Sequence, residues 1–576
     1  MIFEDDILES FKKLGKTPWG NQVKHINDIL TAYIVDQKKI VILSAPTGLG
    51  KSIIGAVVAD VLHTVISDLV SESDPDFNRC ASFILSQNNM LTAQYHNTFA
   101  GLRNFCLVKG ANNYKCEALS TSLADENAES CCEYDMKKSK ESDLLQIVNK
   151  YCSVCEYSKI KKTRHFTDHI ISNYSYFFVD RLFANSLAYR TITVWDEAHT
   201  INETFAEHCA IFVSEKRLVS YAQEIGEAVK LSDNFVLGVF AKIRDGMKSG
   251  KINDSNYLEY LEELHKAYTT VKVAAKLQAE AAMSFELKEY TKLNKLSKKY
   301  GDLACKIGDL LDFAFEHVFE LNKEAREISV KPIFVGPMFN QLINSEYQLF
   351  MSATVSKELL VHTLGLDPSE VAFIKLPSEF PIENKKVVFL NIAKLNYNSM
   401  KDVVVIDKIN SSCLKLTQRH IDAEESGIII CPSFAVTQTI AEHLRRKGIT
   451  VYEHQSGSKL APLVEQFKLS KSPSVLISPS LFEGVSLDDE ISRFQIFVKC
   501  PYASLGEKRV KYIADKHSTL YELQTILRII QGAGRSVRGP EDYAVTYCLD
   551  SNLSWIWKSE LNVWRDEFSV SFQSLI

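Results

Sequence analysis

Short runs of apolar residues alternate with longer helical segments in two separate parts of the chain. The runs are residues 38–46, 81–86 and 191–195 in the N-terminal part and residues 427–431, 474–478 and 494–499 in the C-terminal part. Apolar runs this short, bounded by polar residues or glycine, are typical of buried strands. Strands that alternate with helices predict a parallel sheet covered by helices. The pattern therefore predicts two α/β domains.

Residues 216–325, between the two predicted α/β domains, have a different pattern. Apolar residues recur there at alternating spacings of three and four, from Tyr257 to Ala275 and again from Leu293 to Ala314. This spacing is typical of helices that pack against each other along a coiled-coil-like seam. We therefore expect two long helices in an antiparallel hairpin. Such a hairpin either packs only on itself or forms a projecting arm.

Composition limits the class of protein. The 576 residues are 46% hydrophobic, 10% aromatic and 24% charged, which excludes a disordered or fibrous chain and suggests several folded domains. The N-terminus lacks the features of a secretory signal, and no apolar run reaches the ~18 residues that a membrane span needs. We therefore expect a cytoplasmic protein. Its formal net charge of −6 means that any nucleic-acid-binding surface must be local.

A phosphate-binding loop is predicted at residues 45–52, which read APTGLGKS. The segment fits the pattern G-x-x-x-x-G-K-[ST] except that Ala45 takes the first glycine position. Backbone N–H groups of such a loop turn toward phosphate oxygens. Lys51 is expected to reach the β- and γ-phosphates of ATP, and Ser52 to bind Mg²⁺. The nucleotide-binding residues predicted in this loop are Thr47, Gly48, Gly50, Lys51 and Ser52.

A pair of acidic residues, Asp196 and Glu197, follows the predicted strand 191–195. Open α/β sheets bind ligands beyond the carboxyl ends of their strands. In that position Asp196 is expected to hold Mg²⁺ and Glu197 to polarise the attacking water. A solvated acidic helix start is the alternative, because carboxylates are common at helix N-termini. The phosphate loop upstream favours the catalytic interpretation.

An arginine motif lies near the C-terminus, where residues 531–538 read QGAGRSVR. Phosphoryl transfer needs positive charge at the γ-phosphate, and an arginine from a second domain commonly supplies it. Arg535 and Arg538 are three residues apart, so on a helix they would share a face and point together into an interdomain cleft. Without the other motifs, surface arginines on a capped helix would be the simpler interpretation. With them, we predict catalytic roles for Gln531, Arg535 and Arg538.

These motifs occur in the order found in superfamily 2 helicases, and their details resemble the XPD/DinG-type iron–sulfur DNA helicases. The resemblance extends over nearly the whole chain. Further motifs carry the resemblance. Gln22 is similar to the adenine-side glutamine motif, and residues 86–94 are similar to the strand-contacting motif Ia. Residues 352–354 are the S-A-T motif, and residues 478–486 are similar to motif V. The resemblance implies that Gln22, Glu483 and Gly484 contact the nucleotide. Trp19 stands where the family usually has an arginine.

The resemblance implies an α/β fold with two RecA-like parallel-sheet motor domains. An iron–sulfur cluster domain and a helical arch domain would be inserted in the first motor domain. The implied segments are 1–105, 166–215 and 326–385 for the first motor domain, 106–165 for the cluster domain, 216–325 for the arch and 386–576 for the second motor domain.

Five of the 13 cysteines fall within 40 residues, from Cys116 to Cys155, and lie between motif Ia and Asp196. From spacing alone, Cys152-x-x-Cys155 fits half of a zinc site as well as part of an iron–sulfur site. The family resemblance places a cluster domain at this point of the chain and implies a [4Fe–4S] cluster. The ligands that we expect are Cys116, Cys132, Cys152 and Cys155, with Cys131 competing with Cys132 for the second position.

A local basic segment adjoins these cysteines. Residues 117–135 contain six acidic residues and no Lys or Arg, whereas residues 136–165 contain eight Lys or Arg against three acidic residues. Such a segment either guides single-stranded DNA or forms a solvated lysine face. Tyr151, Tyr157 and Phe166 are available for stacking on bases.

The resemblance implies an ATP-dependent DNA helicase that moves 5′→3′ along single-stranded DNA and unwinds duplex. Its expected cofactors are Mg²⁺ and a [4Fe–4S] cluster, with ATP as substrate. Its expected partners are single-stranded and tailed duplex DNA, and we expect a monomer that does not associate with membranes. The alternative is a DNA-stimulated ATPase or translocase that removes bound proteins or senses DNA structure without processive unwinding.

Overall fold

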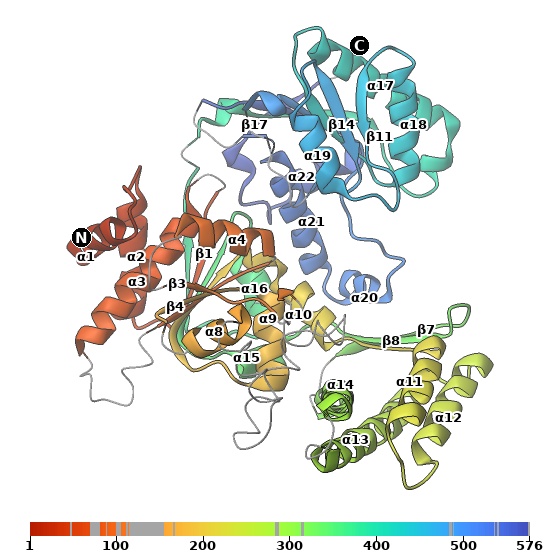
Figure 1. Cartoon of the computed structure of the whole chain (residues 1–576). Helices are drawn as coiled ribbons and strands as arrows, with labels where there is room; N and C mark the ends of the chain where they lie inside the picture. Colours follow the sequence, from red (N-terminus) through yellow and green to blue (C-terminus); the bar gives the residue numbers. More distant parts are fainter. Residues whose placement is uncertain are drawn as a thin grey trace. The chain divides into compact units, whose positions relative to one another are not determined.

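The computed structural model (Figure 1) forms two compact units. It describes residues 1–46, 49–69, 81–87, 89–99, 105–110, 113–114, 155–164, 167–282, 287–312, 316–378, 380–482, 487, 489–534, 536–537 and 541–573. The first unit comprises residues 1–42, 52–351 and 360–374, and the second comprises residues 43–51, 352–359 and 375–576. No helix in these described ranges has the length and apolar character that a membrane span requires.

The first seven-stranded sheet has the strand order β10-β1-β9-β5-β2-β4-β3. Its strands are β1 (Ile40–Ser44), β2 (Ser82–Ser86), β3 (Phe105–Leu107), β4 (His169–Asn173), β5 (Arg190–Asp196), β9 (Ser345–Ser352) and β10 (Val371–Lys375). β2 pairs in parallel with both β4 and β5, and every residue of β2 and β5 is buried. The carboxyl ends of these three strands therefore meet at one edge of the sheet.

Helices surround this sheet. They are α1 (Glu4–Lys13), α2 (Gln22–Ile34), α3 (Lys51–Leu69), α4 (Asn89–Thr98), α8 (Glu156–Thr163), α9 (Tyr174–Val179), α10 (Ile201–Cys209), α15 (Gly336–Leu342) and α16 (Lys357–Leu364), with a π-helical turn η4 (Asp180–Ala184) and a 3₁₀ turn η5 (Ala198–Thr200). Gly55 lets α3 approach the sheet closely, because a Cβ there would lie 2.7 Å from Met351 Cε and 2.9 Å from Val194 Cγ1.

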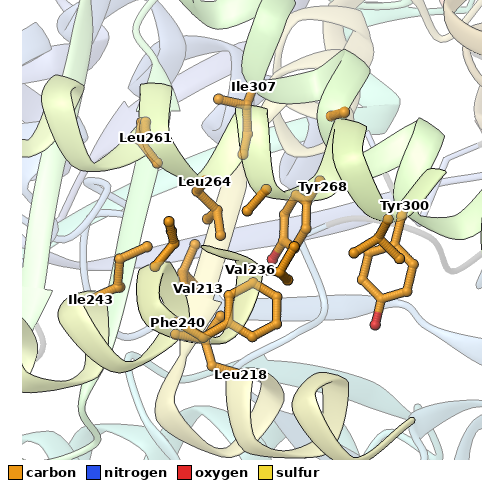
Figure 2. Packing of buried hydrophobic residues seen from close by; sticks show 14 of the residues in the cluster. Val213, Leu218, Val236, Phe240, Ile243, Leu261, Leu264, Tyr268, Tyr300 and Ile307 are labelled. Carbon is orange, nitrogen blue, oxygen red and sulfur yellow. The ribbon is translucent and has the colours of Figure 1, made fainter. Parts of the chain in front are cut away.

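A helical subdomain follows α10 in the same unit. It consists of β6 (Ile211–Ser214), α11 (Glu215–Ala228), α12 (Phe235–Ser249), α13 (Tyr257–Ala282), α14 (Leu287–Asp312), β7 (His317–Asn322) and β8 (Glu327–Pro332). Side chains from β6 and from all four helices point into one apolar core (Figure 2). The two long helices expected from the sequence are thus present. The antiparallel sheet β6-β8-β7 was not expected.

The second seven-stranded sheet lies in the second unit and has the order β13-β14-β12-β15-β16-β11-β17. All its pairings are parallel. Its strands are β11 (Lys385–Ala393), β12 (Gly427–Ile430), β13 (Thr450–Glu453), β14 (Ser474–Ser478), β15 (Phe494–Phe497), β16 (Ala544–Asp550) and β17 (Ser569–Phe572). The six buried strands expected in the two domains are all confirmed, as β1, β2, β5, β12, β14 and β15.

The helices of the second unit are α17 (Val403–Ile421), α18 (Phe434–Arg445), α19 (Leu460–Lys468), α20 (Lys508–Lys516), α21 (Ser518–Ala533) and α22 (Ser551–Trp557). Single 3₁₀ turns occur at η6 (Ile382–Asn384), η7 (Ser399–Lys401), η8 (Asp489–Ile491) and η9 (Arg565–Glu567).

Helix α21 carries the first part of the arginine motif, from Gln531 to Ala533. Helix α21 ends at Ala533, where the Gly534 N–H bonds to the Ile530 carbonyl oxygen at 3.0 Å. Glycine disfavours helix. Ser536 and Val537, which follow it, contact other segments of the second unit. The Ser536 hydroxyl donates to Ser492 at 2.9 Å, and Val537 packs in a separate apolar cluster. Arg535 and Arg538 lie outside the described residues, so the shared face expected for them stays a prediction.

Candidate functional site

The predicted acidic pair lies at the carboxyl edge of the first sheet. Asp196 is the last residue of β5, a strand that is buried along its whole length. Because β5 and β2 pair in parallel, Asp196 lies at the same edge as Ser86, where the motif Ia segment begins. The structure therefore places Asp196 where open α/β sheets bind ligands.

Tyr95, on α4, connects two residues expected to bind magnesium. Its hydroxyl donates to Asp196 Oδ2 at 3.0 Å, and the Ser52 hydroxyl beside it acts to lower the pKa of Tyr95. Burial raises the pKa of Tyr95 well above its ordinary value, and the Asp196 charge raises it further. Tyr95 therefore stays protonated and acts as a donor toward Asp196. The structure thus brings Ser52 and Asp196 to one tyrosine hydroxyl.

A second buried tyrosine holds the backbone at the same point. The Tyr174 hydroxyl donates to the backbone carbonyl oxygen of Asp196. Burial, together with the charges of Asp196 and Glu197, raises the pKa of Tyr174 well above its ordinary value. Tyr174 begins α9, which is capped by Asn173, whose side-chain amide donates to Asn89 Oδ1 at 2.5 Å. Helices α4 and α9 are therefore joined beside the acidic pair.

Glu197 adopts an uncommon backbone conformation. Its φ of +59° lies in the left-handed region, which is sparsely populated by residues other than glycine and recurs at functional sites. Its N–H donates to Asp196 Oδ1 at 3.1 Å, and its carbonyl oxygen accepts from the Thr200 hydroxyl at 2.9 Å. Its carboxylate lies 3.5 Å from His199 Nδ1. These contacts fix the direction of the Glu197 side chain.

The described part of the phosphate loop contains one glycine in the left-handed backbone region. Gly50 has a φ of +73°, which glycine adopts without strain. Ala45 does not require glycine, because its φ is not positive and its N–H donates to the Ser352 carbonyl oxygen at 2.9 Å, as in a strand. The Lys51 ammonium donates to the Ala45 carbonyl oxygen at 3.2 Å. The Lys51 side chain therefore turns back toward the start of the phosphate loop.

Gln22 is almost fully buried, with 2% of its surface exposed. It is hydrogen-bonded to Trp19, which stands where the family usually has an arginine. The Trp19 backbone N–H donates to Gln22 Oε1 at 3.2 Å. A backbone N–H is available whatever the side chain at position 19, so replacement of the usual arginine does not remove this contact. The side chain of Gln22 is held by this bond at the start of α2.

The motif V segment and the S-A-T motif lie in the second unit. The Ser352 hydroxyl accepts from the Thr354 N–H at 3.2 Å, which holds the S-A-T turn. The Ser478 hydroxyl contacts His454 Nδ1 at 2.7 Å and accepts from the Ser480 N–H at 3.0 Å. Gln531 is half-buried on α21.

Several predicted site residues lie outside the described residues. They are Thr47, Gly48, Glu483, Gly484, Arg535 and Arg538 of the nucleotide site, and Cys116, Cys131, Cys132 and Cys152 of the cysteine group. Cys155 is described: it is half-buried, forms no disulfide and directly precedes α8. In the ranges that the structure describes, no group of three or more His, Cys, Asp or Glu side chains is arranged as a metal site.

Known families match both halves of the chain. Residues 80–218 match the DEAD_2 family, and residues 418–567 match the helicase C-terminal domain family. Curated relatives include the ATP-dependent DNA helicase YoaA of Haemophilus influenzae, 20% identical over 454 residues, and YoaA of Escherichia coli, 19% identical over 447 residues. The alignments cover 70% and 69% of this chain and 67% and 66% of the relatives. The chain thus spans about two thirds of their length.

Solved structures extend the similarity to the whole fold. A solved XPD helicase has a TM-score of 0.61 at 15% identity, and the superposition covers 96% of this chain and 100% of that one. The S. tokodaii Xpd4 structure has a TM-score of 0.56 at 15% identity, and the superposition covers 96% of this chain and 99% of that one. The two matched families, the YoaA relatives and the XPD structures together support a superfamily 2 helicase of the XPD/DinG type. The expected α/β fold with two RecA-like parallel-sheet motor domains is confirmed, and the chain is an enzyme of the helicase class.

Two residues of this helicase site, Tyr95 and Tyr174, were missed by sequence reasoning. Tyr95 directly follows the segment 86–94 that resembles motif Ia, and Tyr174 is the first residue of α9. A tyrosine in a helix is most often a packing residue, so neither position differs from an ordinary core position. The only local signal was their proximity in sequence to recognisable motifs.

Proposed function

We propose that this helicase hydrolyses ATP to move 5′→3′ along single-stranded DNA and to unwind duplex DNA. The observation that carries the proposal is that Ser52 and Asp196 meet at the hydroxyl of Tyr95. The site lies at the carboxyl edge of a parallel sheet, directly after a phosphate-binding loop. The two curated relatives are named as ATP-dependent DNA helicases, which supports the same assignment.

Ser52 and Asp196 fit a magnesium site, because one offers a hydroxyl and the other a carboxylate, and Mg²⁺ prefers oxygen ligands. The ion would supply positive charge at the β- and γ-phosphate oxygens of ATP. Lys51 exchanges the Ala45 carbonyl oxygen for these phosphates when ATP binds. Glu197, held by its neighbours at the end of β5, polarises the attacking water.

We assign the remaining nucleotide contacts by motif. Gln22 binds on the adenine side, and Thr47, Gly48 and Gly50 surround the phosphates. In the second motor domain, Glu483 and Gly484 contact the nucleotide. Gln531, Arg535 and Arg538 complete the catalytic site when ATP draws the two motor domains together. Arg535 is the leading candidate for the arginine that stabilises the transferred phosphoryl group.

ATP is needed because DNA binding alone cannot drive net movement. Opening one base-pair step costs about 1.4 kcal/mol, and one aromatic–base stack returns ~1–3 kcal/mol. Binding energy can therefore hold the strands apart, but it does not release the protein from one position on the strand and let it bind at the next. Closure of the motor domains on ATP and reopening after hydrolysis would drive this release and rebinding. The cluster domain and the helical arch would act at the junction between duplex and single strands.

The ATP-hydrolysis part of the proposal is tested by Lys51→Ala. Single-stranded DNA is expected to raise the ATPase rate of the wild-type protein. Lys51→Ala is expected to lower the basal and the stimulated rates by ~10²-fold or more, because it removes the positive charge at the phosphates. Lys24→Ala, the same substitution at an exposed position of α2, serves as control. Wild-type rates in Lys51→Ala would refute the assignment.

We also propose a [4Fe–4S] cluster bound by Cys116, Cys132, Cys152 and Cys155, with Cys131 as the alternative second ligand. Four cysteine thiolates are the usual ligands of such a cluster. The Cys155 thiol is free of any disulfide and partly exposed, which fits a ligand role. The protein is expected to be monomeric, cytoplasmic and associated with DNA.

The cluster assignment predicts about four iron and four sulfide per chain in anaerobically purified protein. Cys155→Ser is expected to lose most of this iron, because serine does not replace a thiolate ligand. Cys106→Ser, in the neighbouring strand β3, is the matched control and should retain it. Metal and sulfide analysis decides between the alternatives, and stoichiometric zinc without iron would contradict the cluster.

A further inference from the structure

We propose that Tyr95 is a positioning residue that aligns the Asp196 carboxylate and the Ser52 hydroxyl for magnesium. This inference rests on the proposed ATP-hydrolysing function of the same site. Tyr95 belongs to α4 (Asn89–Thr98), so it comes from neither the phosphate loop nor the strand that ends at Asp196. A third element of the motor domain therefore determines how the two magnesium ligands are oriented.

The Asp196 carboxylate is held at both of its oxygens. Tyr95 Oη donates to Oδ2 at 3.0 Å, and the Glu197 N–H donates to Oδ1 at 3.1 Å. A carboxylate oxygen has two lone pairs, so one hydrogen bond to an oxygen does not prevent it from also binding a metal ion or a metal-bound water. Because the two donors come from different elements, the plane of the carboxylate is fixed before the ion arrives.

The Ser52 hydroxyl needs an acceptor for its proton if its lone pairs are to face a cation. Tyr95 can provide that acceptor, because a phenol that donates one hydrogen bond still has two lone pairs. Because Tyr95 donates its own proton to Asp196, the neighbouring Ser52 hydroxyl can donate to the phenol oxygen. Both lone pairs of the Ser52 oxygen then remain for the ion.

The position of the Tyr95 hydroxyl is set by the packing of its ring. Tyr95 is 2% exposed, and its ring centroid lies 6.4 Å from that of Phe99. Phe99 in turn stacks on Phe105, with centroids 4.9 Å apart. Phenylalanine at position 95 would preserve this packing and remove only the hydroxyl. Tyr95→Phe therefore separates the hydrogen bonds from the core contacts.

The test measures binding of a fluorescent, non-hydrolysable ATP analogue while Mg²⁺ is titrated. Hydrogen-bond partners that orient metal ligands typically contribute 10–100-fold to metal affinity. Tyr95→Phe is expected to raise the half-saturating Mg²⁺ concentration roughly tenfold and to leave analogue binding in EDTA unchanged. Tyr33→Phe is the matched control, because Tyr33 is buried in the same unit and its hydroxyl donates to the Gln348 carbonyl oxygen at 2.8 Å.

The outcomes separate this inference from the proposed function. An unchanged Mg²⁺ dependence in Tyr95→Phe would overturn the positioning role, as would an equal shift in Tyr33→Phe. Weaker analogue binding by Tyr95→Phe in EDTA as well as in Mg²⁺ would indicate general damage to the site and would also overturn it. If the wild-type protein binds no ATP analogue, the proposed function itself fails and the inference fails with it.

Discussion

Glu197→Gln is expected to lower kcat for ATP hydrolysis by ~10²–10⁴-fold while ATP binding is retained. Glutamine keeps the shape of the side chain but cannot polarise water as a carboxylate does. The backbone at this position has a φ of +59°, and its N–H and carbonyl oxygen are both hydrogen-bonded, so the side chain has a defined direction. Steady-state ATPase assays with a parallel nucleotide-binding measurement check this result.

Glu203→Gln is the control for Glu197→Gln. Glu203 lies on an exposed face of α10, close in sequence, and its substitution removes the same charge. We expect the rate of Glu203→Gln to stay near that of the wild-type protein. A full rate in Glu197→Gln, or an equal loss in both variants, would show that Glu197 does not act on the attacking water.

Leu264→Ala is expected to destabilise the helical subdomain by ~2–5 kcal/mol. Leu264 is 0% exposed and lies on α13, in the apolar core shared by α11, α12, α13 and α14 (Figure 2). Truncation removes apolar contacts and leaves a cavity that the surrounding helices fill only in part. Hydrogen exchange of the α13 amides reports the loss locally, which avoids treating a chain with several domains as a two-state system.

Leu277→Ala on the same helix makes the same chemical change at a position that is 62% exposed. Its effect on α13 exchange is expected to stay within about 0.5 kcal/mol, as for most surface substitutions. Equal acceleration of exchange in the two variants would contradict the packing of α13 described here.

Much of the motor fold could be predicted because it depends on local patterns. Strands β1 and β12 are apolar along most of their length, since both faces of a parallel sheet are buried. The phosphate loop could be predicted because backbone turns and a lysine at fixed spacing leave a recognisable pattern. Asp196 could be placed from the end of its strand alone. The seams of α13 and α14 were visible in the spacing of their apolar residues.

The remaining features depend on contacts between distant segments. Tyr95 reaches Asp196 across 101 positions of sequence, and no local pattern distinguishes a tyrosine that bonds to a carboxylate from one that only packs. The pairing of β6 with β8 joins segments that lie before α11 and after α14 in the sequence. Helix α21 ends at Ala533, and Ser536 then bonds to Ser492 across 44 positions of sequence, which the spacing of the arginines does not reveal.

Strand separation on tailed duplexes tests the central claim most directly. Duplex DNA with a 5′ or a 3′ single-stranded tail is incubated with the protein and ATP, and Lys51→Ala is the control. We predict ATP-dependent separation of the 5′-tailed duplex, little separation of the 3′-tailed duplex, and none with Lys51→Ala. Separation from the 3′ tail alone would contradict the direction. If neither duplex is separated while single-stranded DNA still stimulates ATP hydrolysis, the helicase claim is contradicted and the translocase alternative replaces it.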